Sequence, residues 1–270
     1  MISLITYTPQ KIQHVVKSMW MLQVNAGSEW YEEDIIPDAH HEIIFHVNGH
    51  DANRQSPNET WIKEPDAFIA GQTVTSYKLR LQQGARLYGI RFYPHTLYAL
   101  SGVPCHLLND KLFSLSDVFE KAEFHRCITS AANKTFLNFE ELLVKKLSCV
   151  NYHSAGYNYV QAAISAILSQ HGNIAVDELI KRTGISGKHL DNLFDKYVGL
   201  GPKTISRIIQ LNRFISYKAS QPHKTLTESS YEAGYYDQAH LIKSFRSFTN
   251  TSPSAFFKKA GSINDFFAQL

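Results

Sequence analysis

The stretch 226–253 has the sequence LTESSYEAGYYDQAHLIKSFRSFTNTSP, and it decides the fold of the C-terminal half of the chain. Thr225 stands just before it, and Glu228 follows Thr225 by three positions, which is the capping-box pattern of a helix start. Gly234 can adopt the left-handed conformation that ends a helix, and Asp237 brings a carboxylate to the positive end of the next helix. The stretch therefore predicts two short helices joined by a turn of about three residues.

The second of these helices has one apolar side. Leu241, Phe245 and Phe248 follow one another at spacings of four and three, which places them on one stripe of a helix. Polar side chains such as His240 and Lys243 fall on the other sides. This pattern is typical of a helix-turn-helix unit whose second helix is polar and partly basic.

The same pattern occurs some fifty residues earlier, at 176–202, VDELIKRTGISGKHLDNLFDKYVGLGP. Internal repetition strengthens the prediction for both copies, because two matching units are less easily produced by chance than one. The corresponding positions are Gly184 and Gly234, Leu190 and Leu241, Phe194 and Phe245, Tyr197 and Phe248, and Pro202 and Pro253.

A single helix is predicted between the two units. Pro202 is favourable at a first helical position, and apolar residues such as Ile205, Ile208 and Ile215 recur at helical spacing to about Ala219. Such a helix is roughly 27 Å long at about 1.5 Å per residue. It could hold the second helix of one unit and the second helix of the other about one turn of DNA apart, which is roughly 34 Å.

The runs VGLGPKTISRIIQLNRF at 198–214 and AGYYDQAHLIKSFRSFTNTSPSAF at 233–256 closely resemble the paired helix-turn-helix domain of AraC/XylS transcription regulators. The resemblance covers about 158–259. It implies that helices at 186–196 and 237–248 enter successive major grooves of double-stranded DNA. The DNA-binding residues that it implies are Ser186, Lys188, His189, Asp191, Asn192, Lys203, Gln238, Ala239, His240 and Lys243.

The chemistry of three of these side chains suggests what they could recognise. Asn192 can pair with adenine through two hydrogen bonds, Asp191 can accept from the amino group of cytosine, and Lys243 can donate to guanine. Asn192 and Asp195 stand where the family usually has basic residues, so the first unit is less basic than expected. The alternative for each side chain is an ordinary solvated helix face.

Residues 1 to about 104 are predicted to be rich in β-strands. Apolar runs occur at 15–24, 41–47 and 87–93, and apolar and polar residues alternate over 77–82. The polar residues of 49–58 predict a long loop. Many short strands separated by polar turns are typical of a barrel or sandwich.

Helices are predicted after this β-rich region. Short ones are expected at 95–102 and 112–119, and a longer one at 131–147. We expect a first domain at 1–150, a polar linker at 151–158 and a DNA-binding domain at 159–270. The predicted fold is thus a β-rich barrel followed by an all-helical domain.

The runs PDAHHEIIFHV at 37–47, FIAGQ at 68–72 and YGIRFYPHTLYALSGVP at 88–104 resemble the cupin-like sensor domain that precedes many bacterial AraC-type domains. The resemblance covers roughly 10–120. It implies a small antiparallel barrel that binds an effector or pairs subunits, without indicating which effector. Possible partners are therefore a small-molecule effector, a second copy of the chain in a homodimer and, for an activator, RNA polymerase.

A metal site is one interpretation of four histidines, His40, His41, His46 and His50, which lie close together in sequence beside Glu42. Cupin enzymes bind metals through histidine and carboxylate. However, His41 and His46 are five positions apart and would point to opposite sides of one strand. We therefore predict no metal, no cofactor and no enzymatic activity.

The composition agrees with a protein that binds a polyanion. Residues 151–270 have a net charge of +5 and residues 1–150 one of −2, which together give the +3 of the chain. Cys105, Cys127 and Cys149 form no disulfide or zinc pattern, and the absence of a leader pattern or a long apolar run predicts a cytoplasmic protein without a membrane segment. Three hypotheses remain: an effector-controlled transcription regulator, a constitutive DNA-binding protein with a dimerising barrel, and a cupin-type metalloenzyme.

Overall fold

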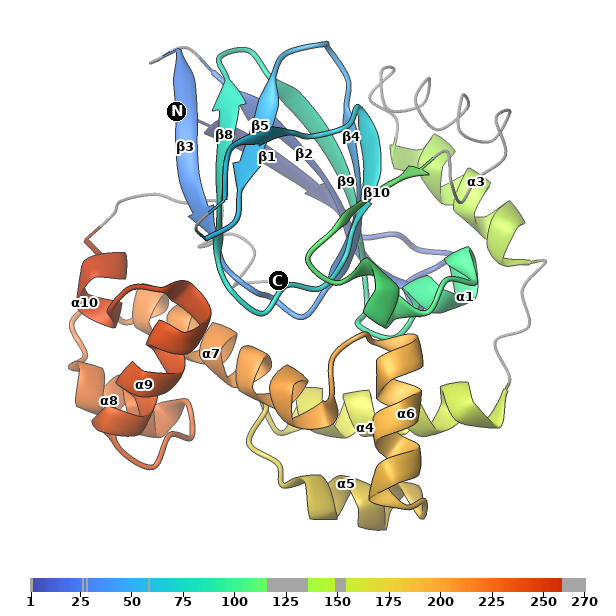
Figure 1. Ribbon diagram of the computed structural model, residues 1–270, viewed down its shortest axis with the longest axis vertical. Coiled ribbons are helices and arrows are strands. Elements are labelled where there is room, and N and C mark those ends of the chain that lie inside the picture. Colours follow the sequence, from blue (N-terminus) through green and yellow to red (C-terminus); the bar gives the residue numbers. More distant parts are fainter. Residues whose placement is uncertain are drawn as a thin grey trace.

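The protein was analysed as a computed structural model, which describes residues 2–25, 27, 29–57, 59–115, 136–148 and 154–258. Figure 1 shows a β-rich part with a group of helices packed against one end of it. The strands come first in the chain and the helices of the second part follow. This arrangement confirms the predicted fold class.

The first part, here called the β-domain, consists of two antiparallel sheets. The larger sheet has the strand order β1-β2-β9-β4-β7-β10, and the smaller has the order β3-β8-β5-β6. The strands are β1 Ile2–Tyr7, β2 Val16–Val24, β3 Trp30–Ile35, β4 His41–His46, β5 Ala52–Gln55, β6 Ile62–Lys63, β7 Ala67–Ala70, β8 Tyr77–Gln82, β9 Arg86–Phe92 and β10 Leu112–Ser114.

The two sheets face each other across an apolar core. In β8, Leu79 and Leu81 point inward and are buried, whereas Lys78 just before them is exposed and Arg80 between them is partly exposed. They pack in one cluster with Trp20, Phe68 and other residues of the larger sheet. The alternation of the β8 sequence therefore predicted correctly which side of the strand is buried.

The other face of the larger sheet is covered by helices (Figure 1). These are α1 Leu97–Ser101, the 3₁₀-helix η1 Cys105–Leu108 and α3 Phe136–Leu147. Phe139 and Leu143 of α3 pack with Ile43 and Ile90 of the sheet in a second apolar cluster. Both faces of the sheet are thus buried at its central strands β2, β9 and β4, which explains why these strands are so apolar.

The second part, here called the helical domain, contains two helix-turn-helix units, α5–α6 and α8–α9, with α7 between them. The predicted helix ends are confirmed, because Gly184 and Gly234 have the left-handed φ angles of 70° and 76°. Its helices are α4 Ala155–Ser169, α5 Val176–Thr183, α6 Gly187–Tyr197, α7 Pro202–Ser220, α8 Leu226–Glu232, α9 Gln238–Thr249 and α10 Pro253–Phe256.

One apolar core holds both units to α7. Phe194 of α6, Phe214 of α7 and Phe245 of α9 are each completely buried in it. The rings of Phe214 and Phe245 meet edge to face, with their centroids 5.9 Å apart. The units therefore share a core through α7.

The β-domain touches the end of α6. Nε2 of His41 lies 3.1 Å from the carbonyl oxygen of Val198, which can only accept, so the ring nitrogen donates. The side-chain amide of Asn109 donates to the carbonyl oxygen of Gly199 over 2.5 Å. Both carbonyls belong to the turn after α6, so the β-domain binds backbone groups that this helix end leaves without intrahelical partners.

The β-domain also touches the end of α9. The backbone N–H of Ser76, between β7 and β8, donates to the carbonyl oxygen of Phe248 over 2.7 Å. The hydroxyl of Ser76 donates to the carbonyl oxygen of Thr249 over 3.0 Å. Both helix-turn-helix units are therefore in direct contact with the β-domain.

Three segments differ from expectation. Residues 112–114 form β10 instead of starting a helix, because they pair with β7. The expected loop 49–58 contains β5, which pairs with β8 and carries Arg54, buried in an ion pair of 2.9 Å with Glu64. The helix α4 begins at Ala155, inside the stretch expected to be a linker.

Some predictions concern residues outside the described ranges. These are residues 116–119 of the second short helix, the start of the expected helix at 131–147, residues 149–153 at the expected linker, and Cys127 and Cys149. Within the described residues, α3 covers 136–147, and Cys105 is a buried free thiol.

We predict that Gly89→Ala destabilises the β-domain. A Cβ at this position would lie 1.9 Å from a ring atom of Trp20, which is itself buried between the sheets. We expect the free energy of unfolding to fall by about 2 kcal/mol or more, measured by urea denaturation. Ser3→Ala, at an exposed position of β1, is the control and should change it by less than about 0.5 kcal/mol. Equal stability of both variants would contradict the packing described here.

Candidate nucleic-acid interface

The second helix of each unit turns one side to the core. Leu190 and Phe194 of α6 are fully buried, and so are Leu241 and Phe245 of α9. The predicted apolar stripes are thereby confirmed. The sides opposite to these stripes are left to solvent, and they carry most of the residues predicted to bind DNA.

On α6 the exposed side is polar. Lys188, His189, Asp191 and Asn192 all lie there with exposed side chains. Ser186 stands at the start of the helix, where its side-chain oxygen accepts from the backbone N–H of His189 over 3.3 Å. This hydrogen bond stabilises the first turn. The hydroxyl hydrogen of Ser186 can still donate to another group.

The exposed side of α9 has a similar arrangement. Ala239, His240 and Lys243 are exposed, and Gln238 is partly exposed with its side-chain oxygen accepting from the hydroxyl of Thr227 over 2.8 Å. Asp237 caps the helix by accepting from the backbone N–H of His240 over 2.6 Å. Its carboxylate lies at the positive end of the helix dipole, as predicted.

The first helix of the second unit begins with the predicted capping box. Thr225 accepts from the backbone N–H of Glu228 over 3.1 Å, and Glu228 accepts from the backbone N–H of Thr225 over 2.8 Å. This backbone hydrogen bond, together with Lys224 at 3.0 Å, lowers the pKa of Glu228 to about 2. The fixed start of α8 sets the position of the turn that leads into α9.

Lys203 lies outside both second helices. It is exposed on the first turn of α7. One turn further along the same side, Arg207 stacks over Phe248 of α9 at 4.8 Å and donates to Ser247 over 3.2 Å. Arg207 is a candidate that the sequence analysis missed, although its spacing of four from Lys203 was a usable signal.

Tyr236 is a second missed candidate. Its side chain is 85% exposed although it is large and aromatic, and it stands directly before the cap of α9. A phenol can pack on a sugar and donate to a phosphate, as tyrosine does at many DNA interfaces. Its unusual exposure makes Tyr236 a candidate DNA contact, and this exposure could not be inferred from the sequence.

The histidines near β4 have separate partners. His41 contacts Val198, His46 contacts Glu64 at 3.1 Å, and His40 lies 3.0 Å from Nζ of Lys17. Within the described ranges, no three His, Cys, Asp or Glu side chains gather as ligands of a metal ion would. Over the same part of the chain, no helix has the length and apolar character needed to span a bilayer.

Two families match separate parts of the chain. Residues 6–114 match a family described as "Domain of unknown function (DUF6597)". Residues 179–259 match a family described as "Helix-turn-helix domain". The second match runs from within α5 to beyond α10, so it includes the exposed sides of both α6 and α9.

Individual proteins are similar over longer stretches. The Msm operon regulatory protein of Streptococcus mutans is 24% identical over 175 residues, which cover 63% of this chain, and the chain spans 59% of that protein's length. The structure of ToxT from Vibrio cholerae matches with 11% identity over 96% of this chain and 99% of its own, at a TM-score of 0.49. The AraC-like transcriptional activator CuxR matches with 13% identity over 89% of this chain and 91% of its own, at a TM-score of 0.30.

We predict that the cap of α9 is needed for a stable interface. Asp237→Ala removes the acceptor for the N–H of His240 and should lower the free energy of unfolding by about 1 kcal/mol, measured by thermal denaturation. Asp237→Asn keeps a side-chain oxygen and is the matched control, with most of the stability retained. A loss as large in Asp237→Asn as in Asp237→Ala would show that the negative charge, rather than the hydrogen bond, is what stabilises α9.

Proposed function

We propose that this chain is an AraC-type helix-turn-helix regulator, which binds a specific site in double-stranded DNA through α6 and α9 under the control of its β-domain. One observation carries this proposal. Each second helix buries one stripe in a core shared through α7 and leaves an opposite side of polar and basic residues exposed.

The length of α7 supports simultaneous binding by both units. It has 19 residues, which at about 1.5 Å each make it roughly 28 Å long. Successive major grooves on one face of DNA are about 34 Å apart. A separation of this order suits two helices, α6 and α9, that enter adjacent major grooves.

Basic residues near α9 suit contacts with phosphates. Arg246 is exposed on α9, and Lys203 is exposed on α7. Such contacts position a protein on DNA without reading its sequence. In our proposal they supply much of the affinity, which should consequently fall as the salt concentration rises.

The polar residues on the two second helices suit base recognition. In our proposal Asn192 pairs with an adenine, Asp191 accepts from a cytosine and Lys243 donates to a guanine. Ser186, Lys188, His189, Gln238, Ala239 and His240 complete the proposed interface, and Tyr236 and Arg207 extend it.

The position of the β-domain supports control by an effector. It binds the ends of both α6 and α9 through backbone carbonyls, so a change in its docking would alter how the two helices are presented. Control of this kind requires an effector that binds one docking arrangement better than another. We propose that a small molecule bound by the β-domain is that effector.

Further elements belong to the same proposal. The protein would act in the bacterial cytoplasm, where its DNA is, and would have no catalytic activity. It would pair as a homodimer, because a single chain recognises only a short asymmetric site. If it activates transcription, RNA polymerase is a partner.

We predict that the base-reading residues Asn192 and Lys243 are needed for sequence-specific binding. A duplex enriched by the full-length protein from a random pool serves as the target, and binding is measured by fluorescence anisotropy. Asn192→Ala and Lys243→Ala should each weaken binding to this duplex by about 5- to 150-fold. Asn192→Ala should leave binding to a random duplex unchanged.

Lys63→Ala is the charge-matched control, because Lys63 is exposed on β6 of the β-domain. It should bind the enriched duplex like the wild type. Equal affinity of the wild-type protein for the enriched and the random duplex would contradict sequence-specific binding. Unchanged affinity in both helix variants would show that another face of the protein binds DNA.

A further inference from the structure

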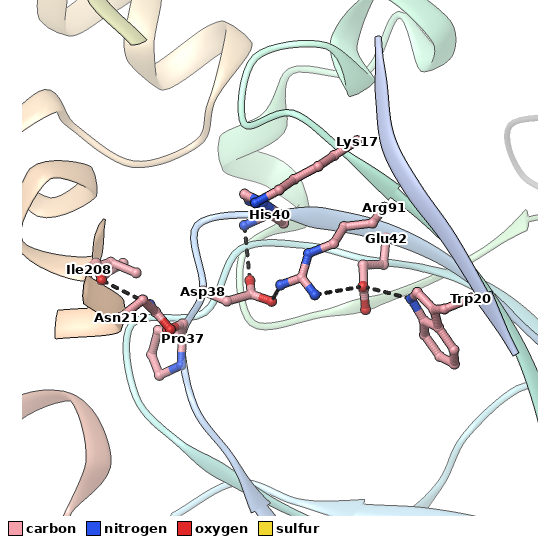
Figure 2. Close-up of polar contacts among 9 residues, drawn as sticks. All are labelled: Lys17, Trp20, Pro37, Asp38, His40, Glu42, Arg91, Ile208 and Asn212. Carbon is pink, nitrogen blue, oxygen red and sulfur yellow. Dashed lines mark hydrogen bonds and ion pairs between the residues drawn. The ribbon is translucent and has the colours of Figure 1, made fainter. Parts of the chain in front are cut away.

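A group of charged side chains lies at the end of the β-domain that faces α7. Figure 2 shows Lys17, His40 and Arg91 beside the carboxylates of Asp38 and Glu42. Arg91 and Glu42 come from the adjacent strands β9 and β4, where they are paired in register. Lys17 comes from β2 on the other side of β9.

A β-bulge sets the direction of Lys17. Val16 of β2 pairs with Phe92 of β9, and Ser18 pairs with Arg91, so Lys17 between them has no residue opposite. An extra residue of this kind re-aims its side chain and is common next to functional sites. The bulge thereby lets the side chain of Lys17 reach His40. In a regular strand this side chain would point in a different direction.

Lys17 has no acidic partner. Its Nζ lies 3.0 Å from Nε2 of His40, and it makes no ion pair with any carboxylate in the part of the chain that the structure describes. Burial lowers the pKa of Lys17 to about 8, so the ammonium group remains mostly protonated at neutral pH. Burial also holds the pKa of His40 well below its usual value, so its ring is neutral. A largely buried cation therefore faces a neutral partner, which is unfavourable without an anion.

Arg91 has carboxylate partners, but they do not balance both cations. Its side chain is 1% exposed, and it forms ion pairs with Asp38 and, at 3.7 Å, with Glu42. Burial raises the pKa of Glu42 to about 7, although Trp20 donates to this carboxylate over 3.0 Å. Glu42 is accordingly partly protonated at neutral pH. Among the five side chains Lys17, Asp38, His40, Glu42 and Arg91, positive charge is therefore in excess.

Asp38 can be replaced from the solvent side. Its side chain is 26% exposed, in contrast to the fully buried Arg91. It stands in the loop 36–40 between β3 and β4, where it also accepts from the backbone N–H of His40 over 3.0 Å. An anion that enters from solvent could displace the carboxylate of Asp38. It would then bind the guanidinium of Arg91, with the ammonium group of Lys17 nearby.

The same loop is attached to the helical domain. The carbonyl oxygen of Pro37 accepts from the side-chain amide of Asn212 in α7 over 2.9 Å (Figure 2). Ile36 and Ala39 are buried in the apolar core of the helical domain. Asp38 thus lies between two residues that pack against the DNA-binding part, and its own side chain reaches back to Arg91.

We propose that Lys17 and Arg91 form a binding site for the carboxylate of a small molecule, which replaces Asp38 on Arg91 and so frees the loop 36–40 to change its contact with α7. A planar carboxylate suits a guanidinium because two parallel hydrogen bonds can form between them. The proposal of the binding site does not depend on the function proposed above. Its effect on DNA rests on the function proposed above.

The binding site can be tested by chemical rescue of Asp38→Ala. This variant keeps Arg91 and Lys17 and vacates the place of the carboxylate, so formate is the probe and formamide is its uncharged control. We expect Asp38→Ala to lower the melting temperature by roughly 5 °C, and formate to restore it in a saturable way at ionic strength held constant with chloride. Formamide should have no effect.

Lys17→Met combined with Asp38→Ala tests the second cation. Methionine replaces a buried ammonium without an acidic partner, so Lys17→Met alone should fold with an unchanged or higher melting temperature. The double variant should bind formate at least about tenfold more weakly than Asp38→Ala. The binding site is overturned if formate acts no better than chloride on Asp38→Ala, or equally well on the double variant. Phosphate acting more strongly than formate would overturn the choice of a carboxylate.

The link to α7 has a separate readout. The affinity of the wild-type protein for its enriched duplex should change by fivefold or more with saturating acetate, and not with acetamide. Asp38→Ala should show the changed affinity without acetate. Rescue by formate with no effect of acetate on DNA would overturn the link but not the binding site. Failure of the wild-type protein to bind any duplex would overturn the proposed function, and the formate experiment would still decide the site.

Discussion

The burial of the apolar stripes of α6 and α9 against α7 is the constraint on which the rest of the helical domain depends. Phe194, Phe214 and Phe245 have no exposed surface, so the orientation of each second helix about its own axis is fixed. Once these rings are buried, Asn192 and Lys243 must lie on the solvent side. The exposed faces of the two helices are in this sense a consequence of the core, and a change in the core would rotate them.

Much of the helical domain could be predicted from local sequence, because its helix ends are determined by nearby residues. Asp237 and Thr225 each cap a helix through hydrogen bonds that span three positions. Asn250 adopts the left-handed conformation after α9, with a φ angle of 54°, which asparagine tolerates better than most residues. Such contacts involve neighbours in the chain, so a pattern of a few residues is enough to reveal them.

The β-domain was less predictable because its decisive contacts join residues far apart in sequence. The strand β5 lies in a polar run, and the buried side chain of its Arg54 is stabilised by an ion pair with Glu64 and by stacking over the ring of Tyr77. The bulge at Lys17 depends on the register of β2 against β9. The attachment of the loop 36–40 to α7 joins Pro37 to Asn212, 175 positions later. None of these long-range pairings produces a periodic pattern in the sequence around either residue.

Ser76 supplies hydrogen bonds to the last carbonyl groups of α9, although it belongs to another domain. A helix end without such partners frays, so the β-domain stabilises the final turn of α9 in addition to the local end at Asn250. The isolated helical domain would keep that local end but would lose both hydrogen bonds from Ser76. The connection between β7 and β8 is constrained for the same reason, since an insertion or deletion before Ser76 would carry this donor away from α9. Differences in the length of that connection among related chains would indicate which of them keep this contact between domains.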